Sequence, residues 1–178
     1  MNKVLLFASL FFFLPLLLIA QKNQDFILTM QKDTLYGKIK LNLKTNVITF
    51  DYQGNRVSFE AKTIDNFGIF RKGQTHVYKT ITNDWKEEVF VEVLAEGTLN
   101  LYRYDTSGNK HYEEDAFDYR YYLSESNEGY IRVTPRSYKN VLKKIVKNQP
   151  YLLAQKIGYE DVPRIVGEYN KLVRLTSL

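Results

Sequence analysis

Four carboxylates near the middle of the chain come closest, in type and spacing, to a catalytic or metal-binding group. Two carboxylates can act as general acid and general base in a hydrolase, and a larger group can bind Ca²⁺. They lie within a short segment: Glu113, Glu114, Asp115 and Asp118. A hydrolytic site requires at least two of them to converge in a concave, partly buried place. The alternative is the charged, solvated edge of a hairpin.

A calcium loop is a second hypothesis for the same region. Asp105, Ser107 and Asn109 have the spacing of the first three ligands of such a loop. The sixth position requires Gly for a sharp turn but holds Lys110, and the twelfth requires Glu but holds Ala116. The sequence therefore predicts no metal site here.

Tyrosines are abundant, with 14 in the chain, and many fall on the later predicted strands. A Tyr side chain has an apolar ring and a polar hydroxyl, so an exposed row of them can bind a glycan, a lipid or a protein partner. The alternative is that the rings pair across strands inside the sheet, where Tyr is a favoured residue. The candidate ligand-binding residues are Tyr102, Tyr104, Tyr119, Tyr121 and Tyr122.

Other common catalytic arrangements are absent from the sequence. The chain has no Cys, and its two histidines, His76 and His111, lack the spacing of metal ligands. Neither a G-x-S-x-G nucleophile motif nor a glycine-rich phosphate loop occurs. We therefore predict a protein that is not an enzyme and that holds no cofactor and no metal.

The first 20 residues have the pattern of a secretory signal peptide. Lys3 precedes an apolar run over Val4–Ile19, and the small residue Ala20 ends it. The run is shorter than the ~20 residues that a membrane-spanning helix needs, and Pro15 interrupts it. Leu18 stands where a small residue is usual before a cleavage point, so an uncleaved membrane anchor is the alternative.

This segment predicts an exported protein, located in the periplasm, on the outer envelope or outside the cell. Without Cys, the chain can carry neither a lipid-modified N-terminal Cys nor a disulfide. Its stability must therefore come from burial of apolar and aromatic side chains.

The positive charge of the chain is concentrated at its C-terminal end. Residues 131–178 hold 10 Lys/Arg against 3 Asp/Glu, a net charge of +7, whereas residues 21–130 hold 14 against 17, a net of −3. An exported protein rarely meets nucleic acid, so an anionic envelope surface or an acidic protein is the better partner for a basic segment. The alternative is that these side chains simply line the solvated faces of helices. After signal cleavage, no membrane span is expected.

Alternating apolar and polar residues, separated by turn signals, predict about eleven short strands. At the centre is a hairpin over Glu88–Asp105, whose turn at Glu96-Gly97 we expect to use a positive φ at Gly97. The other expected strands cover residues 26–30, 34–41, 47–52, 56–60, 66–71, 75–82, 110–114, 119–123 and 130–133. A single helical turn is expected between Ala61 and Asn66.

From Thr134 the apolar period changes from 2 to 3.6. Thr134 or Ser137 can cap a first helix, a short helix is predicted over Pro150–Ile157, ended by Gly158, and a third begins near Asp161. Their apolar positions are Tyr138, Val141, Leu142, Ile145 and Val146 in the first helix, and Val162, Ile165, Val166, Tyr169, Leu172 and Val173 in the third.

Together these elements predict an α+β fold in a single domain, residues 21–178. An antiparallel β-sandwich or partly closed barrel, 21–133, is followed by a C-terminal basic helical segment, 134–178, packed on it.

Three stretches carry a resemblance to a known group of proteins. They are DTLYGKIKL (33–41), VFVEVLAEGTLNLYRYD (89–105) and the late helix with Glu168-Tyr169-Asn170. With them, the chain resembles uncharacterised exported β-rich proteins of Bacteroidota-type Gram-negative bacteria. The resemblance implies an envelope location and brings no activity or functional residues. We expect a non-enzymatic binding, structural or assembly protein.

Overall fold

The computed structural model describes residues 24–29, 31–107, 117–125, 129–153 and 156–176. The predicted signal peptide and the expected strand over 110–114 lie outside the described residues. So do His111 and three of the four candidate carboxylates, Glu113, Glu114 and Asp115.

In the described residues, ten strands form an antiparallel sheet that does not close, in the order β10-β9-β8-β7-β6-β5-β1-β2-β3-β4. The alternation of apolar and polar residues gave nearly the correct ranges, so the predicted α+β class with a C-terminal helical segment is confirmed. The strands are β1 Asp25–Leu28, β2 Thr34–Asn42, β3 Val47–Tyr52, β4 Asn55–Glu60, β5 Asn66–Arg71, β6 Gln74–Thr82, β7 Glu88–Ala95, β8 Leu99–Asp105, β9 Tyr119–Glu125 and β10 Ile131–Val133.

The helical elements are η1 Ala61–Thr63, α2 Tyr138–Ile145, η3 Pro150–Leu153, η4 Tyr159–Asp161 and α3 Val162–Thr176. The predicted helix over Pro150–Ile157 is too long, because η3 ends at Leu153 and Lys156–Gly158 is not helical. Gly158 begins the next element instead of ending this one. Its backbone is extended, and its N–H donates to the Asp161 carboxylate at 2.8 Å.

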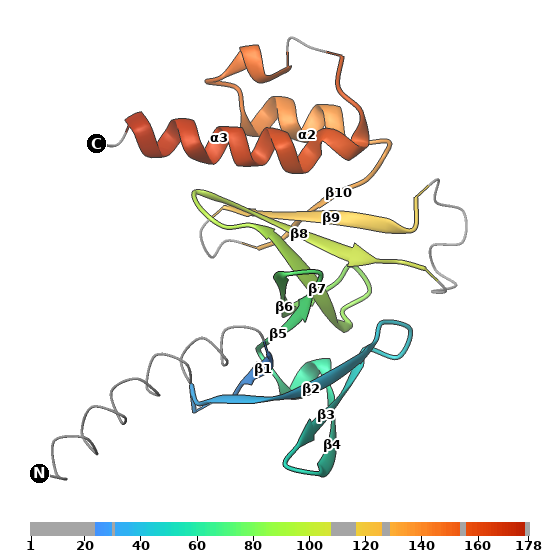
Figure 1. Cartoon of the computed structure of the whole chain (residues 1–178). Helices are drawn as coiled ribbons and strands as arrows, with labels where there is room; N and C mark the ends of the chain where they lie inside the picture. Colours follow the sequence, from blue (N-terminus) through green and yellow to red (C-terminus); the bar gives the residue numbers. More distant parts are fainter. Residues whose placement is uncertain (1–23, 30, 108–116, 126–128, 154–155, 177–178) are drawn as a thin grey trace, which may run out of the picture. The chain divides into compact units, whose positions relative to one another are not determined.

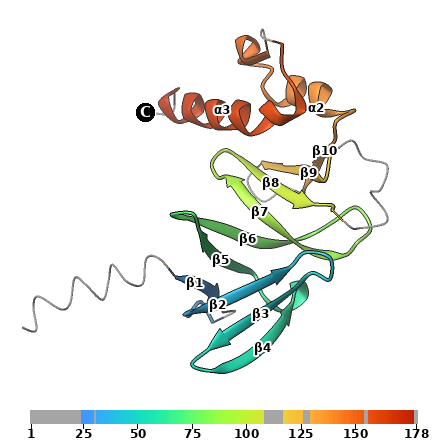
Figure 2. The same cartoon turned by 45° about the vertical axis from the view of Figure 1, so that its right-hand side comes forward.

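The contacts divide the chain into two compact units, with the main boundary inside β6 between Tyr78 and Lys79. The expected single domain stays a prediction. In the first unit, Ile27, Ile48 and Phe67 are buried. The Asp25 carboxylate accepts the N–H groups of Ile39 and Phe70, both at 2.8 Å, and so links β2 and β5 where β1 begins. Figure 2 shows β2, β3 and β4 side by side.

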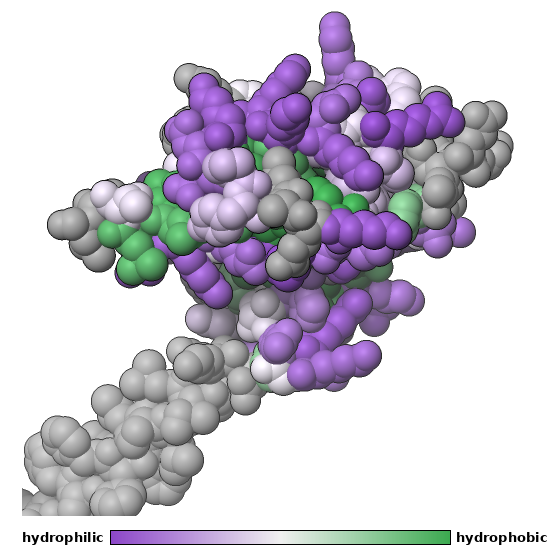
Figure 3. Space-filling view, turned by 90° about the horizontal axis from the view of Figure 1, so that it is seen from above, coloured by the Kyte–Doolittle hydropathy of each residue, from purple (hydrophilic) through white to green (hydrophobic). Residues whose placement is uncertain are grey.

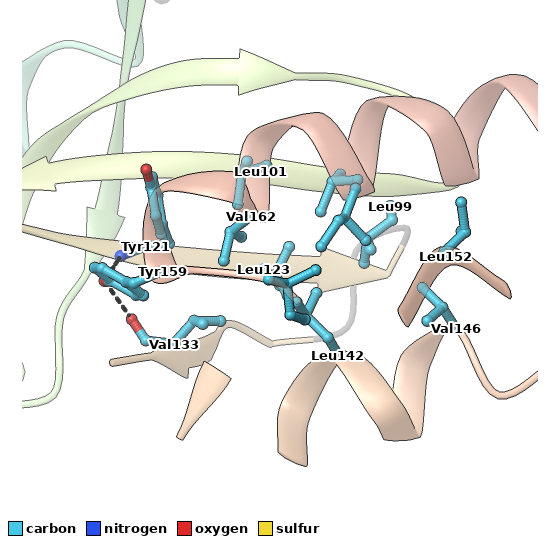
Figure 4. Packing of buried hydrophobic residues seen from close by; sticks show 13 residues of the cluster. Leu99, Leu101, Tyr121, Leu123, Val133, Leu142, Val146, Leu152, Tyr159 and Val162 are labelled. Atoms are coloured by element: carbon cyan, nitrogen blue, oxygen red, sulfur yellow. Dashed lines mark hydrogen bonds between the residues drawn. The ribbon is translucent and has the colours of Figure 1, made fainter. Parts of the chain in front are cut away.

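In the second unit, α2 and α3 cover one face of β8, β9 and β10 (Figure 1). Leu99, Leu101 and Leu123 point from the strands into this core, and the helices contribute Leu142 and Val162 (Figure 4). All five side chains are fully buried. The predicted apolar stripes therefore face the sheet, as the 3.6-residue period requires.

The hydroxyl of Tyr159 lies among these apolar groups and joins two strands. It donates to the Val133 carbonyl at 2.8 Å and accepts the Tyr121 N–H at 3.2 Å (Figure 4). Val133 and Tyr121 are directly opposite in the β10–β9 register. A side chain from η4 thus provides hydrogen bonds at the end of this strand pair.

Asn170 fixes α3 to the β7–β8 hairpin in a similar way. Its carboxamide accepts the Leu99 N–H at 2.9 Å and donates to the Leu99 carbonyl at 2.8 Å. The expected positive φ at Gly97 is wrong, since among the described residues the glycines with positive φ are Gly54 and Gly73. Gly97 is needed for space instead, because a Cβ there would lie 2.8 Å from the Asn170 Cγ atom.

Candidate functional site

The five candidate tyrosines do not form one row, because alternation along a strand sends neighbouring side chains to opposite faces. Tyr102, Tyr104 and Tyr122 belong to a cluster with Val89 and Val91. Tyr119 and Tyr121 point to the other face and join the core beneath the helices. The two groups therefore have different surroundings.

The hypothesis of a solvent-facing row does not fit four of these residues. Tyr102, Tyr104, Tyr121 and Tyr122 are at most 4% exposed. Tyr119 is half-buried and stacks on Tyr159, with ring centroids 5.7 Å apart. The alternative of cross-strand aromatic pairing fits better, since Tyr102 and Tyr122 are register partners.

The surroundings of the Tyr121 hydroxyl disfavour its ionised form. Burial is the main cause that raises the pKa of the Tyr121 hydroxyl far above its usual range, and the hydrogen bond with Tyr119 raises it further. The hydroxyl therefore stays neutral at physiological pH. Lys79 donates to the Tyr102 hydroxyl at 2.9 Å, and nearby Tyr130 is 39% exposed. Tyr130 packs against the buried ring of Tyr102, with ring centroids 5.7 Å apart, so it offers a small open aromatic surface for a glycan.

The described residues give little support to the hypothesis of a carboxylate site. Asp118 is exposed, and its backbone carbonyl accepts the Thr106 N–H at 2.8 Å. Among the described residues, no group of three or more His, Asp and Glu side chains could hold a metal ion. His76 is half-buried on β6.

The C-terminal helical segment presents a set of exposed basic side chains. We call these nine exposed residues the basic layer: Arg136, Lys139, Lys143, Lys144, Lys147, Lys156, Arg164, Lys171 and Arg174. Figure 3 looks down on this segment and shows hydrophilic side chains crowded over the helices. Their exposure agrees with the position of these residues off the apolar stripes.

Arg164 of the basic layer is paired with acidic residues of the same segment. Asp161 and Glu168 both pair with Arg164, at 3.4 and 3.3 Å. Within the described residues, Lys143 and Lys147 make no ion pair within 4.0 Å. Lys139 and Lys143 are four residues apart on one side of α2, and Lys147 lies two residues beyond the C-terminal end of this helix.

Local hydrogen bonds fix where this segment begins. The Thr134 N–H donates to the Ser137 hydroxyl at 3.0 Å, and the Ser137 N–H donates to the Thr134 hydroxyl at 3.2 Å. The Thr134 carbonyl accepts the Tyr138 N–H at 2.9 Å. Of the two predicted caps, Ser137 takes the N-cap position without a side-chain bond to the helix, and the reciprocal bonds with Thr134 close the turn before α2.

Comparisons with known proteins add no information on the function of this chain. No family model, no curated protein and no solved structure matches this chain. Within the described residues, every helix is too short or too polar to cross a membrane. The resemblance to exported envelope proteins stays a prediction.

Proposed function

We propose that this chain is a non-enzymatic protein of the bacterial envelope that docks on a membrane surface rich in anionic lipid headgroups. The observation that carries the proposal is the basic layer, in which nine exposed Lys and Arg residues lie on one helical segment. Anionic headgroups attract such clusters with roughly 1 kcal/mol for each Lys or Arg close to the surface.

The arrangement on α2 favours an external partner for these charges. Like charges four residues apart destabilise a helix by a few tenths of a kcal/mol for each pair. Lys139 and Lys143 form such a pair on a helix of 8 residues, and Lys147 follows two residues after the end of this helix; α2 contains no acidic residue. An anionic surface would remove this repulsion, so binding and helix stability would support each other.

Two exposed apolar side chains favour lipid over an acidic protein or a soluble polymer. Leu175 is 70% exposed and Tyr151 is 53% exposed. Leu175 lies four residues after Lys171, so both point to the outer side of α3. Tyr and Leu beside Lys and Arg are typical of surfaces that lie at the headgroup level of a bilayer.

The experiment is co-sedimentation of the chain from Gln21 onward with vesicles, since residues 1–20 would bind lipid by themselves. Vesicles that contain phosphatidylglycerol are compared with vesicles of phosphatidylcholine alone. We expect binding to the anionic vesicles at low ionic strength and its loss near 1 M salt, because the screening length falls from about 10 Å at 0.1 M to about 3 Å. Equal binding to both vesicles, or binding that salt does not change, would overturn the proposal.

A further inference from the structure

Strand β4 is an open edge in the first unit. It stands last in the strand order, and five of its six residues are exposed. Val57 is 46% exposed, although it points to the same side as Phe59. β4 contains no Pro, and its register with β3 runs without a bulge from Asn55 to Glu60. Natural sheets usually protect an edge by such devices, so β4 is available to another strand.

The hydrogen-bond pattern shows which backbone groups of β4 point outward. The Ala61 N–H donates to the Asn46 carbonyl at 3.2 Å, so residue 61 faces β3. Successive residues of an antiparallel strand face opposite neighbours, and Val57 and Phe59 therefore also face β3. The N–H and C=O groups of Arg56, Ser58 and Glu60 consequently point away from the sheet.

We infer that a second copy of this chain pairs with β4 through its own β4, antiparallel and centred on Ser58. In this register, Ser58 faces Ser58 of the second copy, and Arg56 faces Glu60. Each of these pairs exchanges both backbone N–H···O=C bonds. Val57 faces Phe59 of the second copy on the other side of the strand, which covers the exposed apolar side chain.

Charge complementarity favours a second copy of this chain as the partner of β4, and it favours this register over its neighbours. A two-fold axis at Ser58 places two Arg–Glu pairs directly opposite each other, a favourable cross-strand combination. An axis at Val57 would leave Arg56 opposite Ser58. An axis at Phe59 would put Arg56 opposite Lys62, which has the same charge. Glu60 already forms an ion pair with Lys62 at 2.7 Å, so it would lie between two cations.

The first test is the mass of the whole chain in solution, measured by sedimentation velocity over a range of concentrations. We expect a dimer for the natural sequence and a folded monomer for Ser58→Pro. Proline lacks the outward N–H and is tolerated on an edge strand when that group faces solvent. A natural chain that stays monomeric, or a Ser58→Pro dimer of unchanged affinity, would overturn the inference.

A charge exchange tests the register without proline. Arg56→Glu and Glu60→Arg should each weaken dimerisation about tenfold, because every attractive pair becomes repulsive at both symmetric positions. The double variant Arg56→Glu/Glu60→Arg should regain the natural affinity, since each new Glu faces a new Arg. Equal weakening in the double variant would contradict this register.

A single cysteine gives a third measurement, because the chain contains none. Residues in a hydrogen-bonded antiparallel pair have Cα atoms ~5.5 Å apart, within the range of a disulfide. Ser58→Cys should therefore form a disulfide-linked dimer under mild oxidation. Arg56→Cys is the matched control, because the two copies of residue 56 would lie four residues apart along the strands, roughly 13 Å. Cross-linking in the control but not in Ser58→Cys would count against the pairing.

Discussion

Replacement of Lys139, Lys143 and Lys147 together by Gln is expected to weaken binding to anionic vesicles about 100-fold at low salt. Each Lys close to an anionic surface contributes roughly 1 kcal/mol, and three such losses correspond to about this change in affinity. Gln is as good a helix former as Lys, so α2 should remain folded. The measurement is a vesicle titration at fixed ionic strength, with circular dichroism to check the helix content.

The matched control removes the same amount of charge elsewhere. Lys32, Lys72 and Lys86 are exposed turn residues with positive φ, and none belongs to the basic layer. Their joint replacement by Gln should change the affinity by less than about threefold, since salt screens charges that are not part of the proposed contact surface. An equal loss in both triple variants would show that net charge alone governs binding.

The second large effect concerns stability. Tyr159→Phe should lower the free energy of unfolding by about 3 kcal/mol, because the hydroxyl serves two buried backbone groups. The Val133 carbonyl and the Tyr121 N–H would both lose a partner, at a place where Val133 is fully buried. Removing the hydrogen-bond partner of a buried group lowers the free energy of unfolding by about 1–3 kcal/mol, more than the net contribution of a typical hydrogen bond. Urea denaturation of the chain from Gln21 onward measures the change.

Tyr151→Phe is the control for this substitution. Tyr151 is half-exposed, so loss of its hydroxyl should change the unfolding free energy by less than about 0.5 kcal/mol. If Tyr159→Phe cost no more than this control, the hydroxyl would not be a structural link between the strands.

The course of the strands and of the first and third helices could be predicted from the sequence because both depend on local periodicity. The same rule separates the tyrosines, since Tyr121 and Tyr122 are adjacent on one strand and must face opposite sides. Applying it fully would have divided the candidate ligand-binding residues between two faces. Periodicity does not report how deeply each face is covered, and Tyr102 and Tyr122 are buried because packing covers both faces.

The links between helices and strands could not be predicted, because their partners are far apart in the sequence. Asn170 bonds Leu99 across 71 residues, and Tyr159 bonds Tyr121 across 38. Gly97 illustrates the difficulty: a turn glycine suggests positive φ, but here it provides room for Asn170, which no local pattern indicates. The basic layer was predictable as charge, and the structure adds that all nine side chains are exposed.

Lysine footprinting tests most directly the claim that the basic layer is the docking surface. The chain from Gln21 onward is acetylated briefly with and without phosphatidylglycerol vesicles, and the modification of each lysine is read by mass spectrometry. We expect Lys139, Lys143 and Lys147 to become protected while Lys32, Lys72 and Lys86 react as before. Protection of Lys32, Lys72 and Lys86 with continued reaction of the three lysines of the basic layer would contradict this docking surface.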